Sequence, residues 1–254
     1  MKNTSMKNLW AWAGETAAVM TEILFPRRCP VCDGILPFRQ GKICLPCFQK
    51  LSFTNPPTCK KCGKEVIGDS TEYCFDCFRK RKSFEYGIAL LNYDDSSRHS
   101  MARIKYGGRK EYMEFYGEAM AVRYEKRIER MRADALIPVP VHKDRLKARG
   151  FNQADALARS IACSLKQPVP VLENILVRNK KTMPQKDLSP EERLKNLSEA
   201  FEVKKENIPD GIKRVILVDD IYTTGSTAEA CTRVLLEAGI EQVYLLNVCI
   251  GHGR

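Results

Sequence analysis

The chain has 254 residues and a formal net charge of +11, and 44% of its residues are hydrophobic. These values support one large or two smaller folded domains and argue against wholesale disorder. No apolar run in the sequence is long enough to span a bilayer, which excludes an integral membrane protein. Glu15 and Glu22 interrupt the stretch where a secretion signal needs an apolar core, so we expect a cytoplasmic location.

The first segment of the chain, residues 1–25, is predicted to contain an amphipathic helix. Trp10, Ala13 and Ala17 recur at helical spacing, and Pro26 follows as a stop signal. The polar face carries few basic residues, so we expect the helix to pack on the protein and not to lie on a membrane.

Eight of the eleven cysteines form four CxxC pairs, each separated from the next by eleven residues. A CxxC pair places two thiolates on one tight turn, and two such pairs make the four-thiolate site that zinc prefers. Four pairs therefore predict two structural Zn²⁺ sites in a double zinc ribbon over residues 26–82, with sequential and interleaved pairing both open. Redox-active thiols are the competing interpretation, but a redox CxxC stands alone at a helix start. The predicted ligands are Cys29, Cys32, Cys44, Cys47, Cys59, Cys62, Cys74 and Cys77.

The basic charge is concentrated in the same region, since residues 1–82 hold 14 Lys or Arg and 7 Asp or Glu. The basic cluster at residues 79–82 closes the ribbon module. We interpret it as a solvated linker, with a phosphate-contacting patch as the alternative. The remaining cysteines are predicted to be small core residues; they are Cys163, Cys231 and Cys249.

Strands and helices alternate through residues 83–254, which predicts one α/β domain. Lys105 and Tyr106 fall at a helix end, where they either line a ligand site or have no special role. Asn152 is predicted to cap a helix. Expected strands cover residues 86–93, 135–141, 175–178, 200–203, 215–218 and 242–250, and expected helices cover residues 98–105, 111–128, 153–165 and 228–239.

Residues 179–197 are polar and separate two strand-like runs. This connection is long for a compact domain, so we predict a mobile lid over a binding site. An ordinary loop with a short helix is the alternative.

The most specific motif is VILVDDIYTTGST at residues 215–227. An apolar strand buried on both faces runs into two acids, Asp219 and Asp220, and then into a small, hydroxyl-rich loop. The loop opens a helix, whose free N–H groups favour an anion such as phosphate. The acids suit a diol, so the motif describes a site for a ribose 5-phosphate at the carboxyl end of a parallel strand. An ordinary strand–turn–helix is the alternative, but it has no need for paired acids.

This segment resembles the phosphoribosyl pyrophosphate (PRPP) loop of type I phosphoribosyltransferases. The resemblance implies a parallel sheet flanked by helices, and PRPP bound with Mg²⁺. It also implies that Asp219 and Asp220 hold the ribose hydroxyls and act in the catalytic centre. The 5-phosphate would be held by Thr223, Thr224, Gly225, Ser226 and Thr227.

Three further segments narrow the resemblance: VPVHKDRLKARGFNQA at residues 139–154, RNKKTMPQ at residues 178–185, and the CxxC module. Together they resemble the ComF family, amidophosphoribosyltransferase-like proteins associated with natural competence and uptake of transforming DNA. The resemblance extends from about Phe25 to Cys249. It implies that Arg193 in the lid reaches pyrophosphate. The pyrophosphate loop and its following cations would be Val139, Pro140, Val141, His142, Arg145 and Arg149.

These features predict a Mg²⁺-dependent, PRPP-binding phosphoribosyltransferase-like protein of the ComF type, with an acceptor that the sequence does not identify. The alternative is a competence protein that binds single-stranded DNA and whose PRPP site is regulatory. Single-stranded DNA and other competence proteins, such as a helicase, are the expected partners. A third interpretation makes the ribbons a purely structural or docking module.

Overall fold

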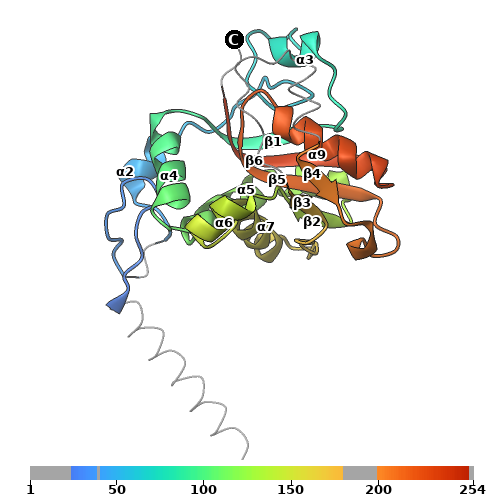
Figure 1. Cartoon of the computed structure of the whole chain (residues 1–254). Helices are drawn as coiled ribbons and strands as arrows, with labels where there is room; N and C mark the ends of the chain where they lie inside the picture. The colour runs from blue at the N-terminus through green and yellow to red at the C-terminus, as the bar shows by residue number, and fades with distance from the viewer. Residues whose placement is uncertain (1–23, 39–40, 180–198, 252–254) are drawn as a thin grey trace, which may run out of the picture. The chain divides into compact units, whose positions relative to one another are not determined.

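The computed structural model describes residues 24–38, 41–179 and 199–251 (Figure 1). The chain divides into two compact units, Met1–Lys50 and Leu51–Arg254. Two predictions lie outside the described residues: most of the helix within residues 1–25, and the lid segment that carries Arg193.

The first unit is a small zinc-ribbon fold in its described part. A tight turn after Cys29 is closed by backbone hydrogen bonds, and the short helix α2 (Leu45–Gln49) follows Cys44. Among its described residues, the buried ones are Cys29, Pro30, Leu36 and Cys47. Such a small apolar cluster contributes little stability by itself, which fits a unit stabilised by a structural metal.

The second unit is built on a four-stranded parallel sheet. The strands are β1 (Gly87–Asn92), β2 (Ala135–Pro138), β5 (Arg214–Tyr222) and β6 (Gln242–Ile250), in the spatial order β1-β6-β5-β2. All three neighbouring pairs are parallel. The strands are almost continuously apolar and buried, as expected for a parallel sheet covered on both faces. The sheet therefore confirms the predicted α/β class.

Helices cover both faces of this sheet. Helices α5 (Tyr112–Met131) and α7 (Gln153–Ser164) pack against each other on one face, and α9 (Ser226–Glu237) lies on the other (Figure 1). Helix α7 begins after Asn152, whose side chain accepts a hydrogen bond from the Ala154 backbone and so acts as the predicted cap. The helices of this unit include α4 (Asp95–Tyr106), α5 (Tyr112–Met131), α6 (Lys143–Arg149), α7 (Gln153–Ser164) and α9 (Ser226–Glu237).

A separate hairpin brackets the expected lid. Strands β3 (Leu176–Arg178) and β4 (Phe201–Val203) pair antiparallel, and the 3-10 helix η2 (Lys205–Asn207) follows them. The two strand-like runs predicted on either side of the lid therefore meet as neighbours.

The second half of the cysteine module also belongs to the second unit. Helix α3 (Phe75–Arg79) and the cysteines around it share one hydrophobic core with Phe84 and Tyr222. The division between the compact units thus falls after Lys50, whereas the sequence analysis placed its module boundary near residue 82. The limits predicted from the sequence, residues 26–82 for the double zinc ribbon and residues 83–254 for the α/β domain, stay a prediction. Among the described residues, no helix is both long and apolar enough to cross a membrane.

Candidate functional site

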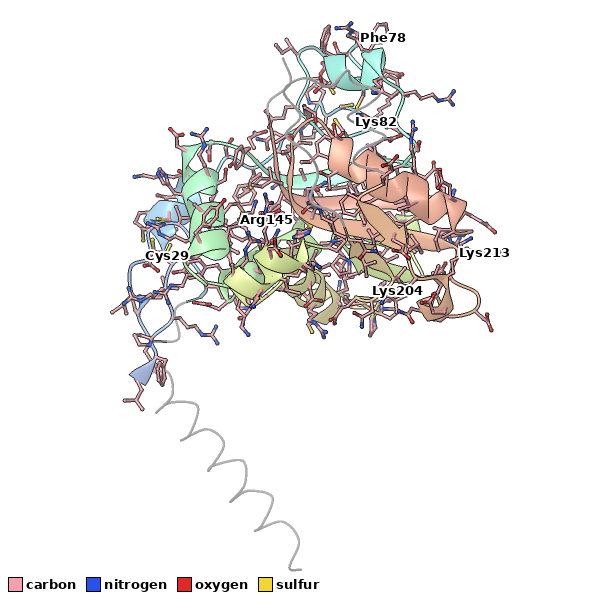
Figure 2. The ribbon with its side chains drawn as sticks, viewed as in Figure 1. Cys29, Phe78, Lys82, Arg145, Lys204 and Lys213 are labelled. Carbon is pink, nitrogen blue, oxygen red and sulfur yellow. The ribbon has the colours of Figure 1, made fainter. Side chains whose placement is uncertain are left out.

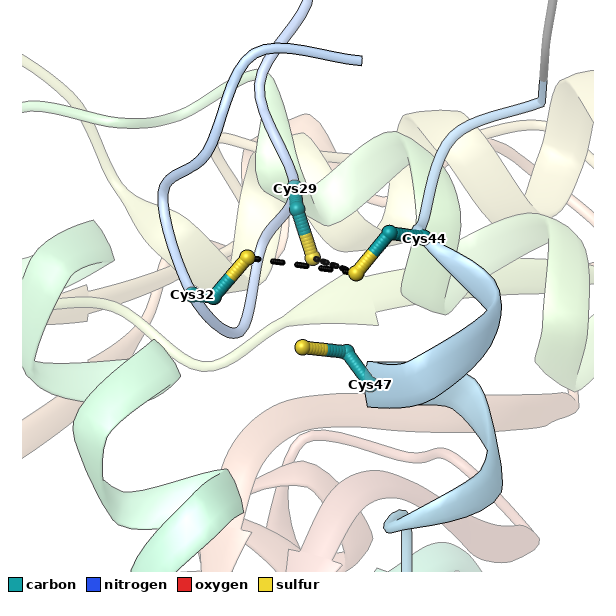
Figure 3. Close-up of side chains that lie close together, drawn as sticks. All are labelled: Cys29, Cys32, Cys44 and Cys47. Atoms are coloured by element: carbon teal, nitrogen blue, oxygen red, sulfur yellow. Dashed lines mark hydrogen bonds between the residues drawn. The ribbon is translucent and has the colours of Figure 1, made fainter.

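The cysteines form two tetrads, and they pair sequentially along the chain. Figure 3 shows the first tetrad, in which Cys29, Cys32, Cys44 and Cys47 converge from the tight turn and the start of α2. The Gly34 backbone N–H donates to the Cys32 Sγ at 3.4 Å. Such N–H···S bonds orient thiolates for a metal. The question that spacing left open is settled in favour of sequential pairing.

The second tetrad repeats this design with all four cysteines buried. Its members are Cys59, Cys62, Cys74 and Cys77. Gly63 closes the first turn in the left-handed region, with φ of 83°, and α3 starts after Cys74. The buried Lys64 amine forms an ion pair with Asp76 of α3 at 2.7 Å, which ties the turn to the helix.

The sulfur positions fit zinc. A tetrahedral ion with Zn–S bonds of about 2.3 Å holds its sulfurs about 3.8 Å apart. The Cys44 Sγ lies 3.7 Å from the Cys29 Sγ and 3.9 Å from the Cys32 Sγ. In the second tetrad, the Cys62 and Cys74 sulfurs are 3.5 Å apart. Four converging thiols without an open position are typical of structural zinc, so the two tetrads fit two structural sites.

The phosphate loop joins β5 to α9. Gly225 is the N-cap of α9 with φ of 74°, and it supplies no capping side chain. The first backbone N–H groups of α9 therefore point out of the helix end, where they favour an anion. Thr223 and Thr224 are exposed, and the Thr224 and Ser226 hydroxyl oxygens lie 3.0 Å apart. The structure thus brings the predicted loop residues Thr223–Thr227 together around one helix N-terminus.

The paired acids lie at the end of β5. Burial and the neighbouring Asp220 carboxylate raise the pKa of Asp219 well above its usual value. The Asp220 carboxylate is buried and forms an ion pair with the Lys105 amine at 2.5 Å. It also accepts a hydrogen bond from the Gln153 side chain at 3.4 Å. The two carboxylates therefore have different environments, and only Asp220 has a direct basic partner among the described residues.

A basic cavity of about 560 Å³ lies next to this pair. Its size is typical of small-ligand sites. Three cations line it, Lys105 from α4 and Arg145 and Arg149 from α6, together with Tyr106. Burial lowers the pKa of the Arg149 guanidinium, while the Asp220 carboxylate acts in the opposite direction. The arrangement suits a multiply charged anion beside a hydroxyl-bearing group.

The predicted pyrophosphate loop leads into this cavity. The Val139 backbone is fixed by hydrogen bonds to Val218 and from the Asn152 side chain. His142 caps α6, because its Nδ1 accepts a hydrogen bond from the Asp144 backbone N–H. Residues 143–149 form a helix that the sequence analysis did not anticipate, and it ends at Gly150 with φ of 83°. Pro140 and Val141 connect these fixed points, so the loop and its two arginines are held as one segment.

Two cations of the site were not singled out from sequence. Lys105 was left undecided between the ligand site and a helix end, and the structure places it on Asp220. Lys82 was grouped with a solvated linker, but it is buried and donates to the Thr224 carbonyl of the phosphate loop. Each contact joins segments far apart in the chain, so local pattern carries no signal for it.

One cysteine prediction is wrong. Cys163 is exposed on α7, because it lies on the side of that helix turned away from the core. Cys231 and Cys249 are buried as predicted.

Comparison with known proteins identifies the family. The family model of the double zinc ribbon domain matches residues 20–78. The chain is 32% identical over 225 residues to Competence protein F of Haemophilus influenzae, in an alignment that covers 86% of this chain and 95% of the relative. The chain belongs to the ComF family.

Two relatives of lower identity match over similar lengths. Competence protein ComFC of Bacillus subtilis is 29% identical over 204 residues, covering 78% of this chain and 79% of the relative. DNA utilization protein YhgH of Escherichia coli K12 is 25% identical over 227 residues, covering 88% and 97%. ComF membership confirms the resemblance drawn from the sequence, and the family-model match confirms the zinc-ribbon module.

Proposed function

We propose that this ComF protein binds PRPP with Mg²⁺ at the carboxyl edge of its sheet and acts as a phosphoribosyltransferase-like protein in competence. The observation that carries the proposal is the paired acids, Asp219 and Asp220, set between an uncapped helix N-terminus and a cavity lined by three cations. Phosphate, diol and pyrophosphate are the three polar parts of PRPP, and each has a matching group here.

The division of labour follows from the chemistry of each group. The N-terminus of α9 binds the 5-phosphate through backbone N–H groups and the helix dipole. The carboxylates of Asp219 and Asp220 accept hydrogen bonds from the ribose hydroxyls. Mg²⁺, a hard cation that prefers oxygen ligands, supplies charge neutralisation at the pyrophosphate when it is bound.

The cations of the cavity act where charge develops. As the bond from ribose C1 to pyrophosphate lengthens, negative charge collects on the leaving group, and preorganised cations stabilise it. Arg145 and Arg149 reach the cavity from α6, and Lys105 reaches it from α4. Lys105 also forms an ion pair with Asp220 and so holds this carboxylate in place. Arg193, outside the described residues, is proposed to add a further cation from the lid.

The biological setting rests on the relatives. Their names, Competence protein F, Competence protein ComFC and DNA utilization protein YhgH, refer to competence and to the use of DNA. We propose that this chain works in the same process, in the cytoplasm and alongside other competence proteins such as a helicase.

Calorimetry with the full zinc-loaded chain tests PRPP binding directly. We expect Mg²⁺-dependent binding of PRPP by the wild type and at least a 10-fold weaker affinity for Asp219→Ala with Asp220→Ala, since charged hydrogen bonds are each worth about 1.5–3 kcal/mol. Asp95→Ala is the matched control, because this exposed acid sits at the other end of α4 from Lys105. Absence of binding by the wild type, or equal affinity of the double variant, contradicts the proposal.

A second candidate function, binding of single-stranded DNA, is favoured by one surface of the second ribbon. Phe75 and Phe78 of α3 are 53% and 82% exposed, and the Arg79 guanidinium lies 5.3 Å from the Phe75 ring centre. Figure 2 labels Phe78 on α3. Lys80 and Arg81 follow directly and are exposed. Exposed aromatics among basic side chains are what base stacking and phosphate contact require.

A salt-dependent gel shift tests this candidate. We expect Phe75→Ala with Phe78→Ala to weaken binding of an oligothymidylate by at least 10-fold, since a stacked base contributes about 1–3 kcal/mol. Tyr106→Ala removes an aromatic ring of similar exposure from the PRPP cavity and is the control. A wild-type chain that shifts no single strand at low salt excludes direct binding.

A further inference from the structure

The segment that leaves the second ribbon is fixed to the phosphate loop. The Ser83 backbone N–H and hydroxyl both donate to the Glu229 carboxylate of α9, at 2.8 and 2.7 Å. The next residue, Phe84, is fully buried and its ring meets the Tyr222 ring edge-on, with centres 6.4 Å apart. Lys82 and Phe84 are therefore buried, and the exposed Ser83 between them is hydrogen-bonded to α9, so this segment is not a solvated linker.

Lys82 is unusual for a lysine in a basic cluster. It is only 8% exposed, whereas Lys80 and Arg81 before it are exposed. Buried lysines almost always have a partner with negative charge. Among the described residues, Lys82 forms no ion pair, and its ammonium donates a hydrogen bond to the neutral Thr224 carbonyl at 3.1 Å. An ammonium has three donors, so the Thr224 carbonyl leaves this buried cation without a neutralising group.

The loop beside Lys82 also has unused polar groups. The first N–H groups of α9 have no side-chain cap, because Gly225 stands at the N-cap position. Tyr222 is buried, and its hydroxyl has no hydrogen-bond partner among the described residues. The hydroxyl lies so close to Gly225 that a side chain there would overlap it. Unpaired donors and a buried ammonium around one helix N-terminus indicate a ligand with negative charge.

We propose that Lys82 binds the phosphate held by the loop, so that the second ribbon completes the phosphate site of the main domain. This inference rests on the proposed function, because it assigns a further contact to the 5-phosphate of that ligand. A phosphate monoester accepts several hydrogen bonds and carries the charge that Lys82 lacks. The role explains why the last residue of the basic cluster is buried while its neighbours face water.

The inference also gives the ribbon a part in ligand binding. Lys82 follows the last cysteine of the second tetrad by five residues, and the tetrad shares the core with Tyr222. The fold of the ribbon therefore fixes where the Lys82 ammonium lies. On this basis the ribbon contributes a binding group and is not only a docking module.

Calorimetric titration with ribose 5-phosphate and with PRPP tests the inference on the full zinc-loaded chain. We expect Lys82→Met and Lys82→Gln to lower the affinity for both ligands by about 10-fold or more, which is the effect of losing one charged hydrogen bond. Lys82→Arg is expected to restore most of the affinity. Lys80→Met removes the same charge from an exposed position of the same cluster, and we expect less than a 2-fold change.

The variants separate charge from structure. The glutamine can still donate to the Thr224 carbonyl, so a purely structural role of Lys82 predicts near-normal affinity for Lys82→Gln. Zinc content and the unfolding temperature without ligand show whether each variant is folded. Equal affinity of wild type and Lys82→Gln, or equal losses for Lys82→Met and Lys80→Met, overturns the inference while PRPP binding by the wild type stands. Failure of the wild type to bind PRPP overturns the proposed function itself.

Discussion

The two zinc ribbons have the same local design and different surroundings. Each has a tight turn after its first pair of cysteines and a short helix that starts at its second pair. The first tetrad keeps Cys32 exposed and has only a small cluster of its own. The second tetrad is fully buried and belongs to the core of the main domain.

The residue at one turn position reflects this difference in packing. The turn position after the second cysteine is Asp33 in the first ribbon and Gly63 in the second, and both have positive φ, at 62° and 83°. A Cβ at Gly63 would lie 2.8 Å from the Gly87 carbonyl oxygen of β1. The second turn therefore packs directly on the sheet and excludes any side chain. The same cysteine motif is therefore used in two ways. The first ribbon lies in a separate small unit, and the second is part of the main domain.

The largest difference in stability between the two ribbons is expected when one cysteine of a tetrad is replaced. We expect Cys62→Ser to leave little folded protein, because structural zinc contributes about 10 kcal/mol or more to such sites and a domain is stable by only about 5–15 kcal/mol. Cys32→Ser, the matched change in the first ribbon, should release one zinc and leave the main domain folded. Zinc content and thermal unfolding of both variants measure this, and equal losses contradict the comparison.

Substitution in the turns should give the next largest effect. Gly63→Ala introduces a left-handed alanine and a clash with the β1 backbone, and we expect a loss of about 2–4 kcal/mol in the free energy of unfolding. Asp33→Gly, at the equivalent position, should change stability by less than about 1 kcal/mol. Denaturant titration distinguishes the two, and a tolerated Gly63→Ala means that the second ribbon is not packed on the sheet in solution.

The smallest expected effect concerns the hydrogen bonds of Glu229, which attach the second ribbon to α9. Burial alone would raise the pKa of Glu229, but hydrogen bonds from Ser83 and contact with Arg233 lower it below its usual 4.5. Because the pKa of Glu229 is lower in the folded than in the unfolded state, its carboxylate stabilises the protein when the pH is above the unfolded-state pKa. This stabilisation is lost as the pH falls through the folded-state pKa.

We therefore expect Glu229→Gln to cost about 1.5–3 kcal/mol near pH 7, the range for hydrogen bonds to a charged group. The difference from wild type should shrink as the pH falls below 4.5, when the wild-type carboxylate takes up its proton. Glu72→Gln is the control, because this exposed carboxylate of the second ribbon pairs only with Lys60 among the described residues. A pH-independent difference for Glu229→Gln contradicts the assignment.

Much of the candidate site could be predicted from local sequence. The eight cysteines follow from spacing alone, because a CxxC turn is a local structure and zinc needs two of them. The phosphate loop is equally local, since a buried strand, a glycine and a helix start are adjacent in the chain. The strands of the sheet were predicted for the same reason, because continuous apolar runs can be recognised without their partners.

Contacts across the chain could not be predicted in this way. Lys105 meets Asp220 because the carboxyl edge of the sheet brings the end of α4 to the end of β5. Cys163 was placed in the core by residue type, but the packing of α7 leaves it exposed. Helix α6 was missed because a charged run with no buried residue carries no apolar period.

The sequence by itself predicted two four-thiolate sites, a loop suited to a phosphate, and paired acids suited to a diol. Each of these features is formed by residues close together in the chain, so local backbone geometry is enough to predict it. Only the tertiary structure shows which cysteines form each tetrad, which ribbon belongs to the main domain, and which cations lie at the candidate site. The reason is that burial and charge pairing depend on segments that only folding brings into contact, as it brings Lys82 to the phosphate loop.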